Sequence, residues 1–111
     1  MSETIYNKLV RDKIPDIIIK SGKVPKFKCL NYNEYFKYLN EKLLEECHEV
    51  LRANSKVEIL EELADTLEVI KSLTLCLNSN MYELESIRKE KFESRGGFSS
   101  RIFLEKVVDN N

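Results

Sequence analysis

A chain of 111 residues, 42% hydrophobic and 33% charged, has the length for one domain with one modest core. Its 18 Lys and Arg nearly balance 19 Asp and Glu, so no overall positive field favours a nucleic-acid partner. The three cysteines are widely spaced and form no CxxC pair, which argues against a disulfide framework or a structural zinc site and indicates a reducing compartment.

The opening stretch MSETIYNKLVRDK has no apolar signal region, and no apolar run approaches the length of a membrane span. We therefore expect a cytoplasmic protein with no membrane partner. No internal repeat, low-complexity tract or linker divides the sequence, so residues 1–111 are expected to form a single domain. With only three Gly and two Pro, helix is the expected default along the chain.

The first predicted element is a short helix that starts near Pro15. Proline fits the first turn of a helix, Asp12 stands where a capping residue would stand, and Ser21-Gly22 is a stop signal. The next residues, 24–30, are predicted to form an extended connector or a short strand.

Three long helices are predicted to follow, near residues 33–53, 55–77 and 80–94. Asn33 is expected to cap the first. Ser55 and Asn80 are expected to cap the other two, because a glutamate three residues after each completes a capping-box pattern. Gly96-Gly97 ends the last helix, and a short tail follows, either helical or extended. The prediction is an all-α fold, an antiparallel helical bundle.

Apolar residues at helical spacing mark a core-facing stripe on each of the first two long helices. On the first, the stripe consists of Phe36, Leu39, Leu43, Leu44, Cys47, Val50 and Leu51. On the second, it consists of Leu60, Leu63, Leu67, Ile70 and Thr74. The tight connection between the two helices favours antiparallel packing through these stripes.

Pairs of acidic residues flank both stripes. Glu46 and Glu49 lie one turn apart on the first helix, and Glu62 and Asp65 do so on the second. Antiparallel packing would bring the four carboxylates together, and their repulsion would be offset by Mg²⁺, which takes oxygen ligands and commonly meets phosphates. The alternative is a solvated acidic face of the kind that many soluble helices carry.

The acidic pattern also resembles that of a known family. EECHE at 45–49 and EELAD at 61–65 resemble the EExxE…ExxD pattern of the all-α nucleoside triphosphate pyrophosphohydrolases, which include MazG-like proteins, dimeric dUTPases and phosphoribosyl-ATP pyrophosphohydrolase. YNKLVRDKIP and KFESRGGF resemble one MazG-like branch, often labelled phosphoribosyl-ATP pyrophosphohydrolase-like, so that the resemblance covers nearly the whole chain. The resemblance implies a hydrolase that cleaves a nucleotide between the α and β phosphates with Mg²⁺ or Mn²⁺. A house-cleaning role for this hydrolase is part of the same expectation.

The resemblance implies roles residue by residue. The metal ligands would be Glu46, Glu49, Glu62 and Asp65, and the catalytic carboxylates Glu45, Glu46 and Glu49, with Glu45 orienting water or supporting a ligand. Phosphates would be contacted by Lys91 and Arg95, and Lys8, Arg11 and Lys13 would close over the triphosphate. Relatives dimerise, so a homodimer or higher homo-oligomer is expected to complete the core and the site.

Two other functions remain open on the sequence. Glu45 and His48 form the Glu-x-x-His motif of carboxylate-bridged di-iron bundles, but such a site needs two copies, which only a homodimer would supply. A non-catalytic helical module that binds a metal or a partner through its acidic residues is the second alternative. An RNA-binding role is not expected, because no aromatic-basic platform motif is present.

Overall fold

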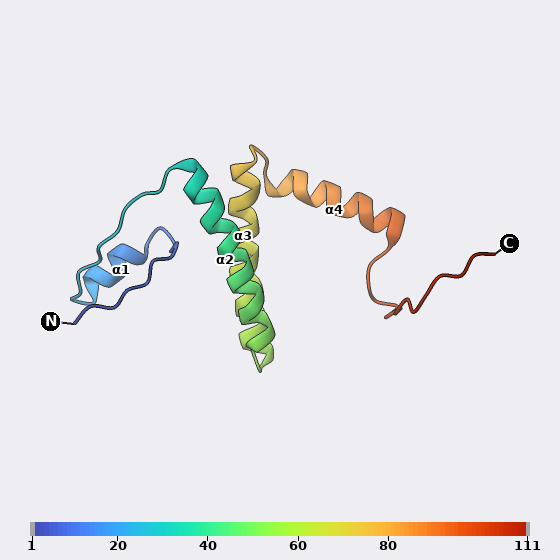
Figure 1. Cartoon of the computed structure of the whole chain (residues 1–111), viewed down its shortest axis with the longest axis horizontal. Helices are drawn as coiled ribbons and strands as arrows, with labels where there is room; N and C mark the ends of the chain where they lie inside the picture. Colours follow the sequence, from blue (N-terminus) through green and yellow to red (C-terminus); the bar gives the residue numbers. More distant parts are fainter. Residues whose placement is uncertain (1, 111) are drawn as a thin grey trace.

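The structure, a computed structural model, describes residues 2–110. Within that range it is all-helical: α1 (Ile14–Lys20), α2 (Tyr32–Arg52), α3 (Lys56–Cys76) and α4 (Met81–Arg95). Figure 1 shows α2 and α3 as an antiparallel hairpin, with the N-terminal segment and α1 on one side and α4 projecting from the other. Over these same residues, no helix has both the length and the apolar composition needed to cross a bilayer.

Helix α1 begins next to Pro15, as predicted, and ends at Ser21. The prediction that Asp12 caps it is wrong. The N-cap is Lys13, whose backbone is already helical, and no side chain bonds to the first turn. The chain enters through a turn in which the Ile14 N–H donates to the Arg11 carbonyl at 3.0 Å. Of the two alternatives predicted for residues 24–30, the structure has the connector, and the short strand is absent because the described chain offers no second strand to pair with it.

Asn31, rather than the predicted Asn33, caps α2. Its extended backbone lets the Asn31 side chain accept from the Glu34 N–H at 2.9 Å, while Asn33 lies inside the first turn. The sequence carried the signal, since Glu34 follows Asn31 by three residues. The other two predicted caps are confirmed: Ser55 accepts from the Glu58 N–H at 3.1 Å, and Asn80 from the Glu83 N–H at 2.9 Å.

The chain leaves α4 at Gly96, as predicted. Gly96 has φ +80°, a left-handed conformation that glycine adopts without steric cost. The tail from Phe98 onward forms one turn and then runs without regular structure, exposed throughout its described length. The helical form of the two predicted alternatives is therefore absent from the described tail.

The buried core is small and lies between α2 and α3. Leu39, Val69 and Cys76 are buried, and the partly buried residues around them are Leu9, Tyr35, Phe36, Leu43 and Leu73. The hairpin register explains the pairing: Leu39 and Val69 lie equally far along the chain from Asn54, so an antiparallel turn there brings them level.

About half of the residues that were predicted to form the core stripes are exposed, so the prediction of their burial is wrong. Leu44, Cys47 and Leu51 of α2 are exposed, and so are Leu60, Leu63 and Leu67 of α3. The reason is that the apolar arc of each helix is wider than one helix–helix seam. The hairpin covers the part of the arc that faces the partner helix, and the rest stays in solvent within one chain.

Candidate metal centre

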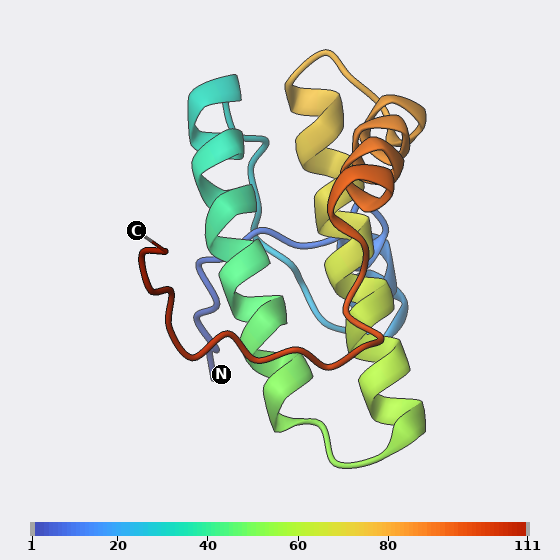
Figure 2. The ribbon, with the colours of Figure 1, turned by 90° about the vertical axis from the view of Figure 1, so that its right-hand side faces the viewer.

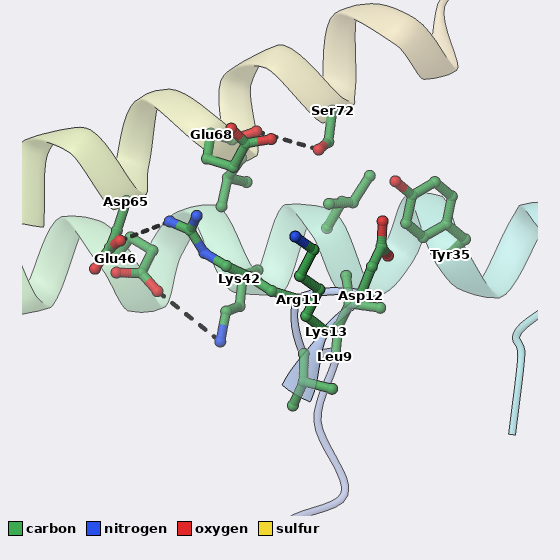
Figure 3. Close-up of a pocket in the computed structure, with 13 residues that line it drawn as sticks. Leu9, Arg11, Asp12, Lys13, Tyr35, Lys42, Glu46, Asp65, Glu68 and Ser72 are labelled. Atoms are coloured by element: carbon green, nitrogen blue, oxygen red, sulfur yellow. Dashed lines mark hydrogen bonds and ion pairs between the residues drawn. The ribbon is translucent and has the colours of Figure 1, made fainter. Parts of the chain in front are cut away.

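Three carboxylates meet in the seam between α2 and α3. Glu46 comes from α2, and Glu62 and Asp65 come from α3; one oxygen of each lies within 4.8 Å of the others. Glu46 and Glu62 are equally far from Asn54 in sequence, so the antiparallel hairpin places them level. Figure 3 shows Glu46 and Asp65 pointing toward one another from the two helices. Three of the four predicted metal ligands are thus brought together.

The fourth predicted ligand, Glu49, lies outside this group. Its carboxylate accepts from the Arg52 guanidinium at 3.1 Å on the partly exposed side of α2. Glu45, the remaining acidic residue of the predicted site, lies 3.6 Å from Lys8 and 3.8 Å from Lys42. Among the described residues, the carboxylates that lie close enough together to share a metal ion are those of Glu46, Glu62 and Asp65, which we call the acidic group.

Burial distinguishes Glu46 from its neighbours. The residue is only 9% exposed, and this burial raises the pKa of the Glu46 carboxyl above its ordinary value of 4.5. Lys42 opposes the rise from 3.9 Å away, while the charges of Asp65, Glu62 and Glu45 add to it. Burial and acidic neighbours thus disfavour the charged form of Glu46, a cost that a bound cation would relieve.

The N-terminal segment supplies positive charge to this side of the hairpin. Arg11 donates to Asp65 at 2.6 Å across 54 positions of sequence, and Leu9 packs against the core beside it. Lys8 reaches Glu45. Of the three basic residues predicted to close over a triphosphate, Lys8 and Arg11 therefore lie at the predicted acidic residues, and Lys13 lines the adjoining pocket.

That pocket has a volume of 440 Å³, within the range of small-molecule sites. Residues 9–13 form one wall, and Lys42, Glu46 and Asp65 line the other (Figure 3). The sequence analysis did not assign Lys42 to the site, although it lies four residues before Glu46 on the same helix. It also missed Glu68, three residues after Asp65, which continues the acidic spacing into the pocket wall.

Lys91 and Arg95, the predicted phosphate contacts of the last helix, are exposed and do not line the pocket. They belong to the last turns of α4, whose far end points away from the hairpin in Figure 1. Within one chain, the fold does not bring these two residues to the acidic group.

The donor set fits a hard divalent cation, because all three groups offer carboxylate oxygens and one of them is buried. Arg11 and Lys13 border the same pocket and could bind phosphate oxygens there. His48, the residue on which a di-iron site would depend, is exposed and does not belong to the acidic group. The Glu-x-x-His pair of the di-iron alternative therefore does not form part of the acidic group within one described chain.

Comparison with known proteins leaves the family open. No family model matches the chain, and no solved structure matches it. A protein of Mycolicibacterium smegmatis, described as an uncharacterized protein, is 42% identical over 53 residues, which cover 48% of this chain and 54% of that relative. The chain thus spans about half the length of the curated relative that it matches.

Proposed function

We propose that this protein is a nucleotide pyrophosphohydrolase that uses Mg²⁺, or Mn²⁺ in its place, to cleave a nucleoside triphosphate between its α and β phosphates. The products would be a nucleoside monophosphate and pyrophosphate, and the enzyme would act as a homodimer or higher homo-oligomer. The observation that carries the proposal is the acidic group, contributed by two helices and bordered by basic residues on a pocket of nucleotide-compatible size.

Glu46, Glu62 and Asp65 would hold the metal, and Glu49 is the further ligand that the sequence resemblance implies. When bound, a divalent cation neutralises phosphate oxygens and lowers the pKa of a bound water. The chain's own residues supply the rest. Glu45 would orient the attacking water or accept its proton, since a nearby carboxylate can act as a general base. No side-chain nucleophile is required.

The basic side chains have a separate task in this proposal. Arg11 and Lys13 would bind the triphosphate and stabilise the charge that develops on the departing pyrophosphate. Before substrate binds, the Arg11 guanidinium is paired with Asp65. Substrate phosphates would draw Arg11 away from Asp65, which is one of the proposed metal ligands. Nucleotide and metal binding are therefore expected to support each other.

The test is a screen for pyrophosphate release over normal and modified nucleoside triphosphates, each with Mg²⁺ and with Mn²⁺. We expect monophosphate and pyrophosphate by chromatography, and loss of activity in Glu46→Gln. Glu41→Gln is the matched control, because it removes an exposed charge from the same helix outside the site. Diphosphate and orthophosphate as the main products would contradict the proposed bond cleavage.

A second function corresponds to one outcome of this screen. Arg11 and Lys42 already partly neutralise the acidic group within the chain, an arrangement that a non-catalytic module could also use. Saturable Mn²⁺ binding without pyrophosphate release from any nucleotide would favour such a metal- or partner-binding module.

A further inference from the structure

The pocket that borders the acidic group continues along the hairpin beyond the proposed metal ligands. Its other end is lined by Tyr35 and Ser72, which stand nearly level because they lie almost equally far along the chain from Asn54. Ser72 follows Asp65 by seven residues, which is about 10 Å along α3. Figure 3 shows Glu46 and Asp65 at one end of the pocket and Tyr35 at the other. The proposed chemistry uses only the first of these two ends.

The second end, which we call the Tyr35 end, has aromatic and apolar walls. Tyr35 is partly buried and packs against the core, of which Leu39 and Val69 line the pocket. Leu9 and Val10 add apolar surface from the N-terminal segment, and Figure 2 shows that segment crossing behind both helices of the hairpin. Nucleobases of every kind stack on aromatic side chains, because each base has a flat π-face. The Tyr35 end therefore has the lining that a nucleobase requires.

The polar groups near this end are mainly hydrogen-bond acceptors. Asp12 and Glu68 line the pocket beyond the acidic group, and an ionised carboxylate accepts hydrogen bonds without donating any. The Ser72 hydroxyl donates to the Glu68 backbone carbonyl at 3.1 Å, so its lone pairs are what it offers to a ligand. A base would satisfy these groups best through an edge that carries N–H donors.

We propose that the Tyr35 end is a base subsite, and that it selects nucleotides whose base carries an exocyclic amino group. Adenine and cytosine present such an amine as a donor, and a Glu or Asp carboxylate is a suitable acceptor for it. Uracil and hypoxanthine place a carbonyl oxygen where cytosine and adenine have the amine, and that oxygen would face Glu68 or Asp12 with no proton between them. This inference rests on the proposed function, because binding of the phosphates at the acidic group directs the base to the Tyr35 end.

Two pairs of substrates that differ by this one replacement test the selection. We expect kcat/KM for CTP to exceed that for UTP by about tenfold, and kcat/KM for ATP to exceed that for ITP similarly. Glu68→Gln offers a donor as well as an acceptor, so it should reduce both ratios severalfold. Glu61→Gln, an exposed residue of the same helix that does not line the pocket, should leave them unchanged. A merely structural defect would lower both members of a pair equally, and unchanged ratios in Glu68→Gln would remove Glu68 from the subsite.

The stacking role of Tyr35 has its own test. Tyr35→Leu should raise KM about tenfold for every nucleotide, whereas Tyr35→Phe, which keeps the ring, should restore most of the loss. Inorganic tripolyphosphate has no base, so its inhibition constant should be the same in wild type and Tyr35→Leu. An equal weakening of tripolyphosphate and nucleotide would show that Tyr35 supports the fold rather than the base.

The same measurements separate this inference from the proposed function. Release of pyrophosphate with equal kcat/KM within both pairs would overturn the base selection and leave the proposed reaction intact. Absence of release from any nucleotide would contradict the reaction, and binding would then decide the selection. Calorimetric titration in Mn²⁺ compares CMP with UMP and AMP with IMP. Tighter binding of CMP and AMP would uphold the subsite, whereas equal or undetectable binding would overturn it.

Discussion

Glu46 is both buried and acidic, and this combination decides whether its side chain stabilises or destabilises the fold with and without metal. Its pKa is raised chiefly by burial, so the folded state holds the Glu46 proton more tightly than the unfolded state does. The free energy of unfolding therefore falls as pH rises from about 4.5 through the raised pKa. When no metal is bound, ionisation of this carboxylate therefore destabilises the hairpin that positions it.

Replacing Glu46 with Gln should relieve this cost. In EDTA at pH 7, the variant is expected to melt at the same temperature as wild type or a few degrees higher, and the difference should vanish below about pH 4.5. In Mg²⁺ at about one hundred times its Kd, wild type gains about 2.7 kcal/mol and the order reverses. Thermal melts with Glu41→Gln as control measure this; an equal gain from Mg²⁺ in both proteins would remove Glu46 from the metal site.

Arg11 is the second residue whose role depends on what occupies the site. Arg11→Gln removes a cation that competes for Asp65, so Mn²⁺ affinity should rise severalfold, while KM for the nucleotide rises about tenfold through the lost phosphate contact. Mn²⁺ titration and steady-state kinetics check both effects. Arg88→Gln, which breaks the Arg88–Glu85 pair on α4, is the matched control. Unchanged Mn²⁺ affinity in Arg11→Gln would show that the pair does not compete with metal.

At the scale of elements, the site depends on the register of two helices. The tight connection at Asn54 sets which residues of α2 and α3 stand level, and therefore brings Glu46 to Glu62 and Leu39 to Val69. Polar caps define where α2 and α3 begin, since the cap side chains satisfy backbone N–H groups that have no partner inside the helix. The hydrogen bonds at the helix starts thus help to position the carboxylates of the acidic group in the absence of any ligand.

The choice of cap on α2 gives a direct test. Asn31→Ala should lower the free energy of unfolding by about 1 kcal/mol, because it leaves the Glu34 N–H without its acceptor. Asn33→Ala should cost nothing as a cap, since Asn33 lies inside the first turn and alanine favours helix. Urea melts of the two variants make the comparison, and an equal loss in both would mean that the α2 N-terminus differs from the structure.

At the scale of the whole molecule, α4 and the tail lie on one side of the α2–α3 hairpin, and the basic N-terminal segment lies on the other (Figures 1 and 2). The acidic group and the basic segment are complete within one chain, whereas Lys91 and Arg95 stand apart from them. In the proposed homo-oligomer, a contact of those two residues with a phosphate at the acidic group would require α4 of another copy.

Mixing two inactive variants tests that requirement. If each site combines Glu46 of one chain with Arg95 of its partner, a mixed dimer of Glu46→Gln and Arg95→Ala chains contains one intact site. An equal mixture should then recover about a quarter of wild-type activity, because about half of the dimers are mixed and each has one good site. Activity assays after subunit exchange measure this. No recovery, with exchange confirmed by mass, would exclude an Arg95 contact from the partner.

The sequence by itself determined the all-α class, the three long helices within a few residues, two of their caps and the closeness of Glu46, Glu62 and Asp65. These depend on local hydrogen bonds and on helical period, which neighbouring residues set. Only the tertiary structure decided that Arg11 pairs with Asp65 and that Glu49 lies outside the acidic group. It also decided which part of each apolar arc is buried, because burial depends on what packs opposite, and one hairpin cannot cover both sides of its own helices.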